Sequence, residues 1–172
     1  MTPEEYLALP EEKPYLEYID GRVEQKPMVN AAHRSLVRRL DALFDRYIES
    51  HGGDAGPEGR VALFGSGQFR LPDTAYWAPG VPSGDDSVPT VAVEVRSPGQ
   101  PLEALRDKCR ASLAAGAQSC WLIDPDARSV EIFDADAPPR LLGTGGMLTT
   151  PAMPGFEANL DALFALLDEP AT

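Results

Sequence analysis

Two carboxylates in strand-like segments, Asp73 and Glu94, are the residues of this chain best suited to chemistry. Glu94 lies in the segment 90–96, where valines alternate with other residues, so its side chain is predicted to project from the sheet face opposite the valines. Asp73 follows Pro72, and proline belongs at strand edges, starts or bends, where a side chain is re-aimed. Two hard oxygen ligands on neighbouring strands suit Mg²⁺ or Mn²⁺, with water in the remaining positions. Taken singly, Asp73 is also typical of a turn and Glu94 of a solvent-facing strand.

Lys108 is the third candidate. It lies in a predicted helix over 101–115 that Gly116 ends. Its neighbours at helical spacing are all small, namely Ala104, Ala111, Ser112 and Ala115. A strand–helix crossover folds this helix back over the Glu94 strand, so the amine could reach Glu94, orient a water or stabilise charge on a phosphate. The alternative is a lysine that lays its stem on the helix and puts its amine in water.

The elements that must position these residues predict an α/β fold, with an N-terminal hairpin turning at Asp20-Gly21. A strand, a helix and a strand over 90–123 predict a right-handed parallel crossover. A turn-rich stretch is expected over 54–59 and an exposed loop over 78–89. The other predicted elements are a short helix after Thr2, a long helix over 30–50, strands at 61–64, 68–71, 74–77 and 129–133, short strands near Leu141 and Met147, and a last helix over 160–167.

Composition limits the possible functions. The 172 residues are expected to form one domain, 1–172, with a core that needs no disulfide. The net charge of −12, from 27 acidic against 15 basic residues, argues against indiscriminate nucleic-acid binding but permits a local basic groove. Cys109 and Cys120 lack a metal-binding spacing and are predicted to be small core residues. The N-terminus lacks the pattern of a signal peptide and no apolar run approaches a membrane span, so a cytoplasmic protein is expected.

The chain resembles the PD-(D/E)XK superfamily of restriction-endonuclease-like proteins, and within it the Uma-two endonuclease family, formerly described as a domain of unknown function. The resemblance covers nearly the whole chain and is specific only when its motifs are taken together. It rests on Tyr18-Ile19-Asp20-Gly21-Arg22-Val23, His33, Pro72-Asp73, Val93-Glu94-Val95-Arg96-Ser97-Pro98, Asp107-Lys108 and Trp121-Leu122-Ile123-Asp124-Pro125. It implies a mixed β-sheet flanked by helices and a Mg²⁺- or Mn²⁺-dependent endonuclease that hydrolyses DNA and acts as a homodimer.

The resemblance also implies roles for single residues. Asp73 and Glu94 would bind the metal with help from the carbonyl of Val95, and Lys108 would be a helix-borne form of the superfamily lysine. Two further positions match. Glu17 is a partly buried carboxylate near the site or a plain exposed strand residue. His33 caps its helix, packs in the core or touches a phosphate.

One position departs from the superfamily pattern. Arg96 stands where the name calls for lysine, two residues after Glu94, and alternation places it on the face of Glu94. Arginine is too basic to exchange protons at neutral pH, so Arg96 is expected to contact a phosphate or to pair with Glu94. Further arginines that could follow a DNA duplex are Arg34, Arg38, Arg39 and Arg46 on the long helix, and Arg106 and Arg110 beside Lys108.

Three hypotheses remain open at this point. The first is a metal-dependent endonuclease, which Asp73, Glu94 and Lys108 favour. The second is a catalytically inactive nuclease-fold protein that serves in binding or assembly, which the acidic charge and Arg96 favour. The third is an enzyme acting on a small molecule, because a fold alone does not fix a function.

Overall fold

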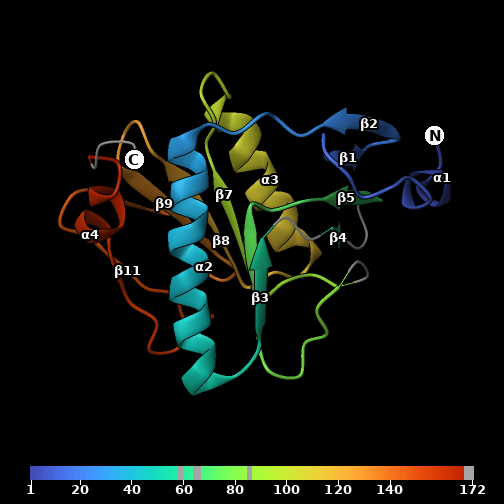
Figure 1. Cartoon of the computed structure of the whole chain (residues 1–172). Coiled ribbons are helices and arrows are strands. Elements are labelled where there is room, and N and C mark those ends of the chain that lie inside the picture. Colours follow the sequence, from blue (N-terminus) through green and yellow to red (C-terminus); the bar gives the residue numbers. More distant parts are fainter. Residues whose placement is uncertain (58–59, 64–66, 85–86, 169–172) are drawn as a thin grey trace.

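A six-stranded mixed sheet with helices on both faces forms the centre of the protein (Figure 1). The computed structural model describes residues 1–57, 60–63, 67–84 and 87–168. In this sheet the strand order is β10-β9-β8-β7-β6-β3. Its strands are β3 (Asp54–Pro57), β6 (Thr74–Trp77), β7 (Val91–Val95), β8 (Ser119–Asp124), β9 (Ser129–Asp134) and β10 (Arg140–Leu142).

Four helices and two smaller sheets complete the described part of the chain. The helices are α1 (Pro3–Leu7), α2 (Ala31–His51), α3 (Leu102–Ala115) and α4 (Leu160–Ala165). A four-stranded sheet has the order β2-β1-β5-β4 and contains β1 (Leu16–Ile19), β2 (Arg22–Gln25), β4 (Val61–Leu63) and β5 (Gln68–Arg70). The strands β11 (Met147–Leu148) and β12 (Ala158–Asn159) pair with each other. The predicted α/β class, with a mixed sheet flanked by helices, is confirmed.

The predicted crossover joins β7 to β8 through α3. β7 and β8 pair in parallel, with Val93 opposite Trp121, whereas the other neighbours in the large sheet are antiparallel. Gly116 ends α3 in the left-handed region, at φ 117°, and its N–H group bonds to the carbonyls of Leu113 and Ser112. A residue with a Cβ is strained there, which explains why the helix stops at a glycine.

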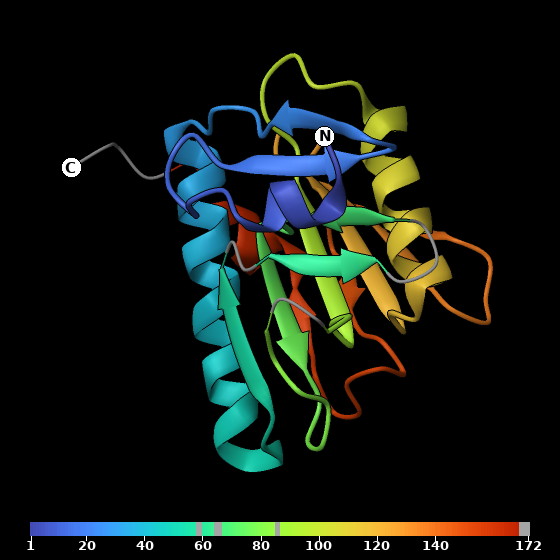
Figure 2. The ribbon, with the colours of Figure 1, turned by 90° about the vertical axis from the view of Figure 1, so that its right-hand side faces the viewer.

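Figure 2 shows α2 and α3 on opposite sides of the large sheet, and the alternating side chains of β7 face one helix or the other. Val91, Val93 and Val95 pack with the apolar stripe of α2, whereas Ala92 packs with α3. Cys109 and Cys120 are buried in the α3 core, as predicted. The side chain of Glu94 therefore projects from the α3 face of the sheet, where it can contact a side chain of that helix.

The N-terminal hairpin crosses beside the large sheet and is anchored by aromatic packing. Asp20 and Gly21 make its turn with positive φ angles, as the Asp-Gly pair predicts. Tyr18 stacks on Tyr6 of α1 at 5.4 Å between ring centroids, and Phe69 of β5 packs on both rings. Because side chains alternate along a strand, burying Tyr18 turns Glu17 to the opposite face.

Two predicted secondary-structure elements differ from the structure, and one prediction falls partly on residues that the structure does not describe. The stretch expected to be turn-rich contains β3, because its backbone pairs with β6 from Asp54 opposite Trp77 to Pro57 opposite Thr74. The short strand β12 was not predicted, since two residues carry no periodicity. Part of the expected turn at 65–67, and the strand end at Phe64, lie outside the described residues. No helix in the described ranges is long and apolar enough to span a membrane.

The α2 stripe should dominate the stability of this fold. Leu40 is fully buried in the core between α2 and the sheet, whereas Leu141 is 71% exposed. Leu40→Ala should lower the free energy of unfolding by about 2–5 kcal/mol, because it removes buried methyl groups and leaves a cavity. Leu141→Ala, the same substitution on the surface, should change it by less than about 0.5 kcal/mol. Urea denaturation of both variants checks this, and equal effects would contradict the packing described.

Candidate active site

A polar cavity of about 170 Å³ lies where the two larger sheets meet. Its walls come from the N-terminal hairpin, the connection between β5 and β6, the end of β7, the start of α2, and one face of α3. The candidate residues Glu17, His33, Asp73, Glu94 and Lys108 all line it, and each is at most 7% exposed. Residues spread over ninety positions of the sequence therefore converge on one buried site.

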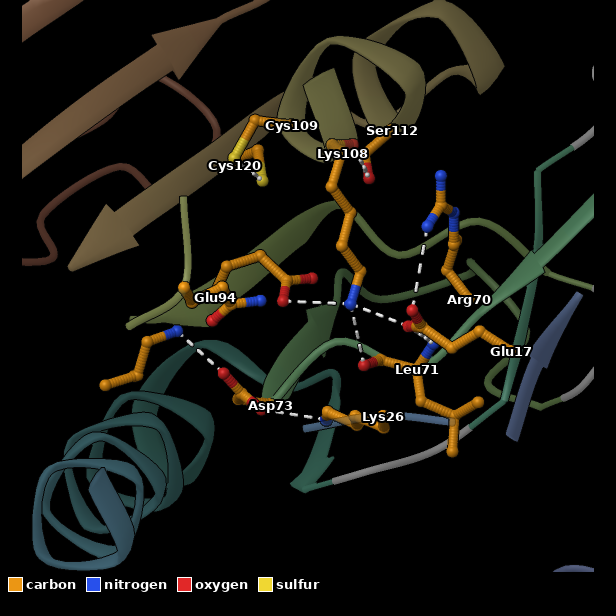
Figure 3. A network of polar contacts seen from close by, with 12 residues as sticks. Glu17, Lys26, Arg70, Leu71, Asp73, Glu94, Lys108, Cys109, Ser112 and Cys120 are labelled. Carbon is orange, nitrogen blue, oxygen red and sulfur yellow. Dashed lines mark hydrogen bonds and ion pairs between the residues drawn. The ribbon is translucent and has the colours of Figure 1, made fainter. Parts of the chain in front are cut away.

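Lys108 reaches from α3 across small neighbours and lies between two carboxylates (Figure 3). Its Nζ atom is 2.7 Å from Glu17 Oε1 and 3.0 Å from Glu94 Oε2. It also donates a hydrogen bond to the carbonyl of Leu71, at 3.1 Å. All three donors of the ammonium group thus have an acceptor, and the alternative of a lysine extended into water is excluded.

The pKa values in this triad reflect burial and charge together. Burial opposes the charge of Lys108, but the carboxylates of Glu17, Glu94 and Asp73 outweigh it and raise the lysine pKa. Burial also opposes the charge of Glu17, yet Lys108, the Leu71 N–H group and Arg70 lower its pKa. Glu94 behaves differently, because full burial and the nearby charge of Asp73 raise its pKa to about 7. Lys108 therefore stays charged at neutral pH, while Glu94 can exchange a proton there.

Asp73 is fixed against the strand that carries Glu94. Its backbone N–H group donates to the carbonyl of Val93 at 2.9 Å, and its Oδ2 atom accepts from the N–H group of Val95 at 2.7 Å. These two partners flank Glu94 in sequence, so the carboxylates of Asp73 and Glu94 meet at one end of β7. The proline before Asp73 marks the bend that makes this possible, as the sequence indicated.

Two cationic or polar side chains complete the surroundings of Asp73. His33 Nε2 lies 3.0 Å from Asp73 Oδ2, and Lys26 Nζ lies 2.8 Å from Asp73 Oδ1. Because a carboxylate only accepts hydrogen bonds, Nε2 is the protonated nitrogen of His33. Burial opposes the charge of Asp73, but Lys26, His33 and Lys108 hold the pKa of its carboxyl well below its usual range. Asp73 is an anion at every physiological pH.

His33 reaches Asp73 because of how α2 begins. Asn30 caps the helix, and its side chain accepts a hydrogen bond from the backbone N–H group of His33 at 2.9 Å. This fixes the first turn of α2 and points the imidazole along the buried stripe towards the sheet. Asn30 is the capping residue, so the side chain of His33 does not cap the helix and instead orients the carboxylate of Asp73.

Arg96 does not line the cavity. Its guanidinium pairs with Asp124 Oδ2 at 3.0 Å and donates to the carbonyl of Gln100 at 2.9 Å. The expected pairing with Glu94 is therefore absent among the described residues, and Lys108 occupies that position. Asp124 follows Cys120 and Leu122 on the α3 face of β8, so Arg96 lies on the face of Glu94, as alternation predicts, but Asp124 holds its guanidinium outside the cavity.

Lys26 and Arg70 line the cavity and were not among the sequence candidates. Arg70 lies 3.6 Å from Glu17 Oε2. A signal for Lys26 was present in the hairpin, because Glu17 pairs with Glu24, and alternation places Lys26 on the same face two residues later. No comparable signal identifies Arg70, whose position depends on the pairing of β5 with β1.

The donor set suits a divalent cation, although no group of three or more His, Cys, Asp and Glu in the described ranges is arranged as a metal site. Asp73 and Glu94 offer hard oxygen atoms that Mg²⁺ and Mn²⁺ prefer, and Mg²⁺ commonly keeps several waters beside one or two carboxylates. The Oδ1 atom of Asp73 is buried and has no well-aligned hydrogen bond within the described chain. A buried carboxylate oxygen beside a cavity is a suitable ligand.

Comparison with known proteins gives a consistent result. The family model described as "Uma2: Putative restriction endonuclease" matches residues 3–162. Among solved structures, a putative nuclease belonging to DUF820 from Anabaena variabilis ATCC 29413 matches with a TM-score of 0.86. That match has 24% sequence identity and covers 97% of this chain and 99% of the other, so it supports the fold. No curated protein matches the chain.

The raised pKa of Glu94 predicts a pH-dependent stability. A folded-state pKa of about 7, above the ordinary 4.5, means that the folded protein holds this proton more tightly than the unfolded chain. Stability should therefore fall as the pH rises from 5 to 7, by about 2 kcal/mol from this group. The lowered pKa values of Asp73 and Glu17 act at lower pH and do not mask the effect.

Glu94→Gln should remove this decrease, because glutamine does not titrate. Urea denaturation at pH 5 and pH 7 measures it, with the exposed Glu12→Gln as a control that keeps the wild-type slope. A Glu94→Gln variant with the same pH dependence as wild type would show that Glu94 is ionised throughout.

Proposed function

Because the chain belongs to the Uma2 family, described as putative restriction endonucleases, we propose that it is a divalent-metal-dependent endonuclease that hydrolyses phosphodiester bonds of DNA. The observation that carries this proposal is the convergence of Asp73, Glu94 and Lys108 on one buried cavity. A metal ion held by carboxylates can polarise a phosphoryl oxygen and activate a water, and a charged amine can stabilise the charge that builds on the phosphate.

Asp73, Glu94 and the carbonyl of Val95 are the proposed ligands. A Mg²⁺ or Mn²⁺ ion held by them would polarise a phosphoryl oxygen and lower the pKa of a bound water. Asp73 is oriented for this by the Val95 N–H group and by His33, which leave Oδ1 facing Lys26 and the cavity. Such orienting partners fix the geometry of a ligand and tune its affinity.

Lys108 is the proposed catalytic cation. Its raised pKa makes it a permanent positive charge, so it stabilises negative charge that builds on the phosphate and does not act as a base. Glu17 positions it from the opposite side, at 2.7 Å. The raised pKa of Glu94 belongs to the site without a metal, and a bound cation would favour its ionised form.

The exposed face of α2 is the proposed DNA track. Arg38, Arg39 and Arg46 are exposed and have no ion pair within the described chain. The arginines of α3 are already neutralised, since Arg106 pairs with Glu131 and Arg110 with Glu103. The helix α2, whose first turn places His33 in the cavity, therefore presents three exposed arginines that can contact phosphate groups. Two copies side by side would be needed to cut both strands of a duplex, so we propose a homodimer.

The second hypothesis, a nuclease-fold protein without catalysis that serves in binding or assembly, has one observation in its favour. Lys26 lies against Asp73, so both proposed metal-binding carboxylates have an ammonium partner. An ion-paired site of this kind would be stable without a metal.

Cleavage measurements separate the two hypotheses. The wild type should cleave DNA with Mn²⁺, and Asp73→Asn and Lys108→Met should each lower the rate by about a hundred- to a thousandfold. Asp73→Asn removes a metal ligand, and Lys108→Met removes the cation that stabilises charge on the phosphate. The exposed Asp126→Asn and Lys13→Met are matched controls and should cleave like wild type.

Circular dichroism must accompany these assays, since Lys108→Met leaves the buried Glu94 without its ammonium partner and Glu17 with only Arg70 and the Leu71 N–H group. The loss should destabilise the fold by about 3–5 kcal/mol. Rates are compared at a temperature where every variant is folded. Cleavage that survives both Asp73→Asn and Lys108→Met would reveal a contaminating nuclease, and a wild type without Mn²⁺-dependent cleavage would favour the binding hypothesis.

Salt dependence tests the DNA track. Each phosphate neutralised by a side chain adds about −0.9 to the slope of log affinity against log salt concentration. The double variant Arg38→Gln/Arg39→Gln should therefore bind duplex DNA with a slope about 2 units shallower than wild type. Arg110→Gln serves as the control, because that arginine already pairs with Glu103 and Asp107. Equal slopes in the double variant and wild type, measured by fluorescence anisotropy, would show that DNA does not bind along α2.

A further inference from the structure

We propose that Lys26 is an internal counter-cation that competes with the divalent metal ion for Asp73 and leaves the carboxylate when the metal binds. This inference rests on the proposed metal-dependent function, and it assigns to Lys26 control over how tightly that metal is held. Figure 3 shows the lysine approaching Asp73 from the hairpin, away from Lys108.

The geometry places Lys26 at the oxygen that a metal would use. Asp73 Oδ2 is already engaged by the Val95 N–H group and by His33. Asp73 Oδ1 faces only Lys26 Nζ, at 2.8 Å, and has no well-aligned hydrogen bond in the described structure. A metal ion bound to Asp73 Oδ1 would therefore compete with the Lys26 ammonium group for the same lone pairs of that oxygen.

Lys26 is held much less well than Lys108. Lys108 has three acceptors within 3.1 Å, which matches the three donors of an ammonium group. Lys26 Nζ has one carboxylate contact and no well-aligned hydrogen bond within the described chain, although its side chain is only 8% exposed. Burying an ammonium group with so little compensation is costly, so Lys26 is the cation that can be displaced.

Charge favours this exchange. The ion-paired groups of the cavity are three carboxylates, Glu17, Asp73 and Glu94, and three cations, Lys26, Arg70 and Lys108. A divalent cation beside Asp73 would repel the nearest ammonium group, since like charges a few ångströms apart destabilise each other. Loss of Lys26 from the cavity removes one positive charge as the metal adds two.

The chain around Lys26 permits the movement. The residue follows the last residue of β2 and precedes the connection to α2, where Met28 is 86% exposed. Its backbone N–H group bonds to the carbonyl of Tyr15, so the main chain is anchored at the end of the hairpin. The long side chain can therefore rotate into water without breaking any strand pairing.

Direct Mn²⁺ binding, measured by the electron paramagnetic resonance signal of the free ion, tests the proposal on the full chain. Lys26→Met should bind Mn²⁺ on the order of tenfold more tightly than wild type, the scale on which neighbours of a ligand alter metal affinity. Lys13→Met removes the same charge from an exposed site and should bind like wild type. Asp73→Asn should lose binding in either background.

The outcomes distinguish the two levels of the account. If wild type binds Mn²⁺ and Lys26→Met binds it equally well or more weakly, the competition is overturned but the metal site is not. Failure of wild type and Lys26→Met alike to bind Mn²⁺ would overturn both the competition and the proposed metal-dependent function.

A measurement on the wild type covers the case in which Lys26→Met does not fold. The chain has three lysines, Lys13, Lys26 and Lys108, so ¹⁵N-lysine labelling gives three side-chain ammonium signals. Saturating Mg²⁺ should move the Lys26 signal to the position typical of an exposed lysine, near that of Lys13. About 10 mM Mg²⁺ nearly saturates a site with a Kd of about 1 mM. A Lys26 signal that does not move at this concentration would overturn the proposal.

Discussion

The ammonium group of Lys108 lies between carboxylates that belong to two different sheets, and the rest of the site depends on this contact. Glu17 comes from the N-terminal hairpin and Glu94 from the central strand β7, while the lysine comes from the crossover helix α3. None of the three side chains could be buried alone, because an isolated charge in the interior is far too costly. Together they join the small sheet, the large sheet and α3 at one point.

The two halves of the cavity differ in how firmly their charges are held. Around Lys108 each donor has an acceptor, so the ammonium group is held from three sides and keeps its charge. Around Asp73 the Oδ2 atom is fixed by backbone and imidazole, whereas Oδ1 and Lys26 face each other with poor hydrogen-bond geometry. The Asp73–Lys26 contact is therefore the weaker of the two, and it is the one that a bound cation would displace under the proposed function.

Much of the fold follows from local sequence signals. The alternation of valines on β7 correctly separated the α2 face from the α3 face, the Asp-Gly pair located the hairpin, and Gly116 marked the end of α3. The small neighbours of Lys108 indicated a lysine that lies against the sheet. These signals succeed because each depends on the periodicity of a single element or on one backbone conformation.

The remaining features depend on contacts between distant elements. The sequence did not identify β3 as a strand, because its pairing with β6 overrides a local composition typical of turns. Alternation placed Arg96 on the face of Glu94, but it could not show that Asp124, twenty-eight residues away, holds the guanidinium outside the cavity. Arg70 was missed for the same reason, since only the pairing of β5 with β1 brings it to Glu17, whereas alternation in the hairpin could have placed Lys26 on the face of Glu17.

The most direct test of the account is a crystal of the protein soaked in Mn²⁺ and measured at a wavelength where manganese scatters anomalously. The account predicts one anomalous peak within bonding distance of Asp73 Oδ1 and Glu94, at about 2.0–2.1 Å as expected for a small hard divalent ion, with the Lys26 ammonium moved away. A peak elsewhere, or none while Lys26 remains against Asp73 and Lys108 against Glu94, would contradict a metal site at this end of β7.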